Sequence, residues 1–346
     1  MNIRPLTSRI GAIARVSGRI LSLWVPGVLL LAGCTTTTTT EPGSLASAEA
    51  LFPSVAVRLE QDTLGRTVRT IGEEIGGGLV SVYGLNERPV PAMNFQGDSY
   101  EVMVGRLAEA TNSIYVDRDY YYLIYPPGYD LLLGHDLSDT LPARYQGMIA
   151  TLALGRDTSL YNAFAMLSDS LGITVIADNA VAEAITGEIT LDNAPLHAVI
   201  EALLQSALVP PQDVVVEATD EYILLSARGN EHPEPLLMNA AELTDAQRAT
   251  LNRRIDLTLP QPNSNANGEV ISFYVEATTL GQVLGSLASQ IGVTVHANEI
   301  IRDLPVNYSI MHDVRVETAL DLIIRQWLVP SFGYTLEENG IHFRVR

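Results

Sequence analysis

In this 346-residue chain, the first candidates for catalysis or for metal and phosphate binding are the histidines, the carboxylates and one glycine run. The histidines lack the spacing of a metal site such as HExxH, and no Ser/His/Asp set stands in a nucleophile-elbow sequence. They are His135, His197, His232, His296, His312 and His342. The run Gly76–Gly78 follows a helical pattern and lacks the Lys-Ser/Thr of a phosphate loop, which favours a helix stop. No catalytic residue, metal site, cofactor or small-molecule substrate is therefore expected.

The only cysteine, Cys34, is the strongest candidate for covalent modification. Four arginines precede an apolar stretch from Ile20 to Ala32, which is too short for a comfortable membrane span and is typical of an export signal. The stretch ends in Leu31, Ala32, Gly33 and Cys34, a sequence that resembles the lipobox of bacterial lipoproteins. The resemblance implies cleavage before Cys34, acylation there and, because Thr35 is not Asp, passage to the outer membrane. The alternative is a chance cysteine after an uncleaved apolar helix.

Charge and composition exclude some partners. The chain has 40 acidic residues against 21 basic ones, all arginine, so it lacks the basic face that a nucleic acid would need. It is 47% hydrophobic and 18% charged, enough for small aliphatic cores. Residues 34–53 begin with a threonine run and contain little to bury, which predicts a flexible tether between lipid and first domain.

Three segments of the chain share one internal spacing. Each opens a helical pattern with a leucine, has a glycine twelve positions later and a second apolar anchor thirty-six positions after the leucine. The leucines are Leu64, Leu160 and Leu280; the glycines are Gly76, Gly172 and Gly292; the anchors are Tyr100, Leu196 and Val316. The copies are 96 and then 120 residues apart, so the agreement lies within units and indicates three copies of one small domain.

The third copy is the clearest. Apolar residues from Leu280 to Ile291 form one helical stripe that ends at Gly292, and a second stripe follows Asp313. Two β-branched strands lie between the helices, and Asn339-Gly340 marks a closing hairpin. With a first strand over Val270–Val275, the predicted order is β-α-β-β-α-β-β.

These units resemble the short N-terminal domain shared by secretins and TonB-dependent transducers. The phrases that carry the resemblance run from Thr279 to Val295 and from Val314 to Leu322, and both later copies end their second helix in Leu-Val-Pro. The fold expected is therefore α+β, three tandem small domains after a cleaved lipoprotein signal peptide at residues 1–33. The expected domains cover residues 54–127, 148–228 and 270–346.

Two linkers separate the expected domains, at residues 128–147 and 229–269. In the first, Leu131-Leu132-Leu133 is expected to pack on a neighbour. In the second, Thr244 to Ile255 is expected to form a helix, with Thr244 and Gln247 as a capping box. The length of the second linker predicts that the last two domains are hinged.

A tyrosine cluster is the candidate protein-binding surface: Tyr120, Tyr121, Tyr122 and Tyr125 on the last strand of the first domain. Alternation along a strand would expose some of these rings, and tyrosine is favoured in binding surfaces. The alternative is ordinary cross-strand packing.

Together these features predict a non-enzymatic lipoprotein of the outer membrane that faces the periplasm and acts as a protein-protein scaffold. By resemblance, its partner would be a secretin, pilus or secretion component. The alternative is a periplasmic sensing module related to transducer signalling domains. A peptidoglycan enzyme is the third class, and no catalytic signal supports it.

Overall fold

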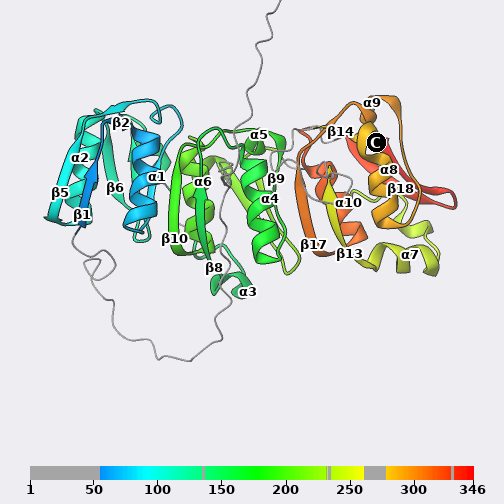
Figure 1. Cartoon of the computed structure of the whole chain (residues 1–346). Helices are drawn as coiled ribbons and strands as arrows, with labels where there is room; N and C mark the ends of the chain where they lie inside the picture. Colours follow the sequence, from blue (N-terminus) through cyan, green and yellow to red (C-terminus); the bar gives the residue numbers. More distant parts are fainter. Residues whose placement is uncertain (1–54, 135–136, 231, 233–234, 261–277, 329–330) are drawn as a thin grey trace, which may run out of the picture.

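The computed structural model describes residues 55–134, 137–230, 232, 235–260, 278–328 and 331–346. Small mixed sheets alternate with helices through these residues, which confirms the α+β class. The same order of elements occurs three times, in unit 1 (55–134), unit 2 (137–230) and unit 3 (235–346). Figure 1 shows the units side by side in one row, in blue to cyan, green, and yellow to red. The predicted signal peptide, Cys34 and the tether lie outside the described residues.

Unit 1 packs two helices against its strands. Strand β1 pairs with β5 antiparallel, and β3, β7 and β6 form the other part of the unit's sheet structure. The elements are β1 (Val55–Leu59), β2 (Asp62–Thr63), α1 (Leu64–Glu74), β3 (Leu79–Ser81), β4 (Pro89–Val90), β5 (Met93–Asp98), α2 (Tyr100–Ala110), β6 (Ile114–Asp117), β7 (Tyr122–Tyr125) and the 3-10 helix η2 (Asp130–Leu133).

Unit 2 repeats this order, with β8 pairing with β10 and β9 with β12. Its elements are α3 (Ala143–Gln146), β8 (Ile149–Leu154), α4 (Leu160–Leu171), β9 (Val175–Ala177), α5 (Asn179–Ala182), β10 (Ile189–Pro195), α6 (Leu196–Ser206), η3 (Pro211–Asp213), β11 (Val214–Ala218) and β12 (Ile223–Ala227).

Unit 3 has the same order again, with β13 pairing with β17 and β15 with β19. Its elements are η4 (Ala240–Glu242), α7 (Asp245–Asn252), β13 (Arg254–Leu259), β14 (Thr278–Thr279), α8 (Leu280–Ile291), β15 (Val295–Ala297), α9 (Glu299–Arg302), β16 (Pro305–Val306), β17 (Ser309–Arg315), α10 (Val316–Arg325), β18 (Phe332–Glu337) and β19 (Gly340–Val345).

The shared spacing reflects the two helices of each unit. Both helices start at equivalent positions in all three units, at the predicted leucines and anchors. Gly172 and Gly292 end α4 and α8 in the left-handed conformation, at φ 63° and 71°, where a side chain is disfavoured. From the first helix to the second, the offset of 96 and then 120 residues therefore assigns each residue of one unit to its equivalent in the next. In the closing hairpins the strand pairing makes the assignment: Tyr122, Ile223 and Ile341 are equivalent because they lie opposite Leu79, Val175 and Val295.

The hydrophobic cores join the units. One cluster of buried side chains runs through units 1 and 2 without a break. A second cluster fills unit 3 and includes Ile176 and Leu224 from unit 2. The hinge expected between the last two domains is thus wrong for the described residues, because apolar side chains of unit 2 are part of the core of unit 3.

The segment 229–269, expected as a linker, also differs from the prediction. Leu236, Leu237, Leu243 and Leu251 are buried in the core of unit 3. The predicted helix is present as α7, with Thr244 and Gln247 as its capping box, but it ends at Asn252, and Ile255 already belongs to β13. Strand β13 of this segment pairs with β17, which is the place predicted for Val270–Val275; those residues lie outside the described part of the chain.

The first linker contributes to packing as well. Leu132 is buried as expected of the Leu131–Leu133 run, whereas Leu131 is 69% exposed. Leu137, Leu141 and Tyr145 are buried with it in the core that units 1 and 2 share. None of the helices in the described residues is long and apolar enough to cross a membrane.

The close approach of units 1 and 2 yields a first prediction. A Cβ on Gly187 would lie 2.0 Å from the Ser81 carbonyl oxygen, so Gly187→Ala forces the two units apart. We expect a loss of about 1–3 kcal/mol in the free energy of unfolding, the usual cost of overpacking, measured by urea denaturation. Gly147→Ala is the control, because a Cβ there meets nothing within 4 Å. Equal stability of both variants would contradict the contact.

Candidate functional site

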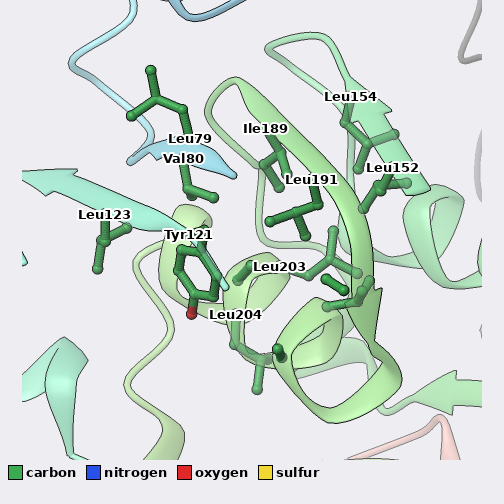
Figure 2. Close-up of a cluster of buried hydrophobic side chains, with 14 of the residues drawn as sticks. Leu79, Val80, Tyr121, Leu123, Leu152, Leu154, Ile189, Leu191, Leu203 and Leu204 are labelled. Carbon is green, nitrogen blue, oxygen red and sulfur yellow. The ribbon is translucent and has the colours of Figure 1, made fainter. Parts of the chain in front are cut away.

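The most elaborate polar contacts of the molecule lie where one unit meets the next. At the first junction, β3 of unit 1 pairs antiparallel with β10 of unit 2, with Val80 opposite Ile189 and Leu79 opposite Thr190. This pairing makes one five-stranded sheet, in the order β6-β7-β3-β10-β8, from strands of both units. Figure 2 shows the shared core around it, where Val80 and Leu123 of unit 1 lie with Leu203 of unit 2.

Small residues allow the two units to come close. A Cβ on Gly72 of α1 would lie 2.5 Å from the Thr190 Cγ2 atom of β10. The Thr190 hydroxyl in turn donates to the Leu79 carbonyl at 3.2 Å. Helix α1 therefore packs directly on the Thr190 side chain of the neighbouring unit's strand.

Backbone and hydroxyl groups at the first junction are satisfied across it. The Ser81 N–H donates to the Glu188 carbonyl at 2.9 Å, and the Ser206 hydroxyl donates to the Ser81 carbonyl at 3.1 Å. The Tyr83 N–H also crosses the junction and donates to the Ser206 carbonyl at 2.7 Å, while within unit 2 the Gly187 N–H holds the Ser206 hydroxyl in place at 2.8 Å. Since unpaired buried polar groups are costly, this network fixes the relative position of the units.

A buried carboxylate belongs to the same junction. Arg69 of α1 contacts the Glu188 carboxylate at 2.6 Å, and the Arg156 backbone N–H donates to it at 3.1 Å. Burial raises the pKa of Glu188 above its ordinary value, even though Arg69 and Arg156 act in the opposite direction. The ion pair is thus a contact between units, and Arg69 is needed to offset the cost of burying the Glu188 carboxylate.

Helix α6 of unit 2 receives the turn between β6 and β7. The Tyr121 hydroxyl bonds the Gln205 Oε1 atom at 2.6 Å, and Arg118 pairs with Glu201 at 3.1 Å. The Leu137 N–H also donates to Glu201, at 2.6 Å. These contacts help explain why ten of the eleven residues of α6 are buried.

The tyrosine cluster is mostly interior. Tyr121 is 1% exposed, and Tyr122 and Tyr125 are each 4% exposed, so these three rings do not form the exposed surface that alternation suggested. Unit 2 covers Tyr121, whose hydroxyl reaches α6, whereas Tyr122 packs within unit 1, with its ring centroid 5.7 Å from that of Tyr100 of α2. Tyr120 alone of the four is open, 41% exposed, with its ring edge-on to His197.

The second junction repeats the contacts of the first at equivalent positions. The Asn179 N–H donates to the Gln326 carbonyl at 2.8 Å, as Tyr83 does to Ser206. The Asn307 side-chain amide crosses the junction and donates to the Asn179 Oδ1 atom at 2.7 Å. Within unit 3 the Asn307 backbone N–H donates to the Gln326 Oε1 atom at 3.0 Å, as Gly187 does to the Ser206 hydroxyl within unit 2. The same surface of the repeating unit is therefore used twice for docking.

One residue distinguishes the two junctions. The Ser168 hydroxyl of α4, at the position of Gly72, accepts from the Val175 N–H at 2.9 Å and contacts the Val175 carbonyl. It thereby occupies the edge of β9 that would otherwise pair with β17. The Thr174 hydroxyl makes the link to unit 3 instead, accepting from the His312 N–H at 2.9 Å.

Ion pairs close the second junction at its polar side. Glu221 of unit 2 contacts Arg315 at 2.9 Å and Arg254 at 3.2 Å, and the Thr318 hydroxyl donates to it at 2.5 Å. Burial by itself would raise the pKa of Glu221, but the Thr318 hydroxyl, Arg315 and Arg254 outweigh burial and hold the pKa below its ordinary value. Glu217 pairs with Arg325 at 2.9 Å beside it.

A polar cleft opens at these ion pairs. It lies between the turn of β11–β12 and helix α10 and is lined by Glu217, Thr219, Asp220, Glu221, Tyr222, Arg315, Thr318, Asp321, Leu322 and Arg325. Among its lining residues, Glu217 pairs with Arg325 and Glu221 with Arg315 across the junction. The cleft is thus part of the docking contact between units 2 and 3.

The predicted chemistry candidates are dispersed. His135 lies outside the described residues, His232 bonds the Trp327 carbonyl at 2.7 Å, and His296 stacks on His342 with ring centroids 4.5 Å apart. In the described part of the chain, no group of three or more His, Cys, Asp or Glu side chains is placed to hold a metal ion.

Comparisons with protein-family models, with curated proteins and with solved structures found no match. The junctions are the contact surfaces that reasoning from single elements missed. Aligning the copies residue by residue could have indicated these contact surfaces. Val80 and Ile176 stand at equivalent positions and are both apolar, on the strand face that points away from the unit's own helices.

The tyrosine contact yields a second prediction. Tyr121→Phe leaves the buried Gln205 amide without its hydroxyl partner, so we expect the free energy of unfolding to fall by about 1–3 kcal/mol. Tyr129→Phe removes a hydroxyl from a ring that is 48% exposed and should change nothing measurable. Urea denaturation compares the two variants; an unchanged Tyr121→Phe variant would show that the bond does not hold the junction.

The charge cluster yields a third prediction. The pKa of Glu221 is depressed in the folded protein, so its contribution is present above the ordinary glutamate pKa of about 4.3 and is lost as pH falls through the lower folded value. Glu221→Gln should therefore be less stable than the parent protein at neutral pH and equally stable at strongly acidic pH. Denaturant unfolding across pH measures this difference, and a pH-independent difference would contradict it.

Proposed function

We propose that this protein is a non-enzymatic scaffold lipoprotein, anchored in the outer membrane through Cys34 and facing the periplasm. Its three tandem β-α-β-β-α-β-β domains resemble the short N-terminal domain of secretins and TonB-dependent transducers. Its partner is a component of a secretin, pilus or secretion assembly.

The observation that carries the proposal is the repeated docking contact. At both junctions, a backbone N–H just after the strand that follows the first helix, β3 or β9, donates to the carbonyl at the end of the next unit's second helix. The distances are 2.7 and 2.8 Å. A module that uses its sheet edge and helix face to bind a neighbour twice is built for binding protein. Repeated modules typically form extended binding surfaces.

The anchor rests on the sequence Leu31, Ala32, Gly33 and Cys34 behind an apolar stretch. Acyl chains contribute about 0.8 kcal/mol for each buried methylene, so two or more chains hold a protein at a membrane stably. Removal of the first 33 residues leaves 17 arginines against 40 acids, a charge that keeps an anchored protein away from anionic headgroups.

Two measurements test the proposal. Cys34→Ser should abolish incorporation of labelled fatty acid and release the protein from the outer-membrane fraction, whereas Thr36→Ser should leave both unchanged. Crosslinking of intact envelopes should then recover a secretion, pilus or transport component with the anchored protein.

The outcomes separate the alternatives. Retention of Cys34→Ser in the outer membrane without acyl label would overturn the anchor. Recovery of no envelope assembly component would overturn the scaffold. A change in transcription on deletion of unit 1, with assembly intact, would identify a sensing module instead.

A further inference from the structure

The two junctions define an outgoing face and an incoming face for the repeating unit. The outgoing face consists of the first helix, the strand after it and the turn of the closing hairpin. The incoming face consists of the strand before the second helix and that helix. Among the described residues, two such faces meet no neighbouring unit: the outgoing face of unit 3, on α8 and β15, and the incoming face of unit 1, on β5 and α2.

Exposure confirms that these two faces are open in the described structure. All three residues of β3 and of β9 are buried, whereas His296 of β15 is exposed. Helix α6 buries ten of its eleven residues and α2 only five of eleven. Val102 of α2, the equivalent of the buried Ala198, is 44% exposed.

The edge of β15 is available for strand pairing. In unit 2 the Ser168 hydroxyl occupies the Val175 backbone, but Ala288 stands at that position in unit 3 and has no hydroxyl. Val295 is the equivalent of Val175 and of Leu79, which pairs with Thr190 at the first junction. Because β15 carries no proline or lysine to protect it, its edge can accept an antiparallel strand as β3 does.

We infer that a second copy of this chain docks there, head to tail, with its β5 strand along β15. Strand β5 is the equivalent of β10, and in the described residues it pairs only with β1. Asn94 of β5, the equivalent of Thr190, is exposed and would lie beside Ala288. The two open faces are thus the two halves of a contact that the chain already makes within itself.

Charge supports the second copy as the occupant. Glu337 of unit 3 stands at the position of Arg118, which reaches the neighbouring unit's second helix at the first junction. On that helix in unit 1 stands Arg106, the equivalent of Leu322, which lines the second junction. Both side chains keep exposed surface beyond their ion pairs with Asp98 and Arg344 in their own units: Arg106 is 52% exposed and Glu337 37% exposed. The docked faces therefore bring opposite charges near each other.

The association is weaker than the internal junctions. The pair His296 and His342 of unit 3 is equivalent to the pair Val80 and Leu123 of unit 1 and to the pair Ile176 and Leu224 of unit 2. Both aliphatic pairs are buried in the shared cores. A stacked histidine pair buries less apolar surface than these aliphatic pairs, so docking is reversible and depends on concentration. A head-to-tail contact between identical chains generates rings or filaments, which for an anchored protein would lie along the membrane.

Cysteine crosslinking tests the contact directly, because Cys34 is the only native cysteine. In the full chain carrying Cys34→Ser, purified in detergent, Asn94→Cys and Ala288→Cys together should give a ladder of disulfide-linked oligomers under mild oxidation. Each cysteine alone should give at most a dimer. A double variant that stays monomeric overturns the inference.

A charge exchange tests the orientation. Glu337→Arg and Arg106→Glu should each weaken self-association at least tenfold in analytical ultracentrifugation, and the two together should restore it. Glu183→Arg, on an exposed site of unit 2, is the matched control and should change nothing. A parent protein that stays monomeric at all concentrations would also overturn the inference, and the histidine pair would then only close the row of units within one chain. The scaffold proposal would stand, because it requires a different partner.

Discussion

The pairing of β3 with β10 is the contact on which the rest of the structure depends. It joins strands of two units into one sheet and places the helices of both units over a common core. Without it, Val80 and Leu123 would face water, and burial of side chains of this size contributes about 1.5–3 kcal/mol each. The units are therefore interdependent, unlike domains joined only by linkers.

Repetition of this contact explains both the row of units and their differences. The same N–H to carbonyl bond recurs at the second junction, but Ser168 blocks strand pairing there, and side-chain bonds and ion pairs replace it. The unit can therefore dock through a continuous sheet or through polar side chains. A face that tolerates both chemistries suits a scaffold, because each copy can be adapted to a different neighbour.

The helices and their register could be predicted from the sequence because they depend on local periodicity and on capping residues. The capping box at Thr244 was likewise visible as a local pattern. Packing between units could be predicted only for the apolar Leu131–Leu133 run, since the other contacts depend on residues far apart in sequence. Alternation within one sheet predicts that some of the tyrosine rings are exposed, but it takes no account of a neighbouring unit, and α6 of unit 2 covers Tyr121.

The first strand of unit 3 shows a different kind of error. Ile255, Leu257 and Leu259 alternate with polar residues as a half-buried strand should, yet the segment is predicted as part of the linker, with Ile255 at the end of its helix. The pairing of β13 with β17 depends on a contact across some fifty residues of chain, which no local pattern reports.

Amide hydrogen exchange at Ser81, Tyr83 and Asn179 tests the central claim most directly. These N–H groups bond only to the next unit, so their protection reports the junctions and nothing within their own units. The continuous structure predicts protection as strong as that of Leu123 inside its sheet. Exchange as fast as that of an exposed strand edge would mean that the units are separate bodies, and would contradict it.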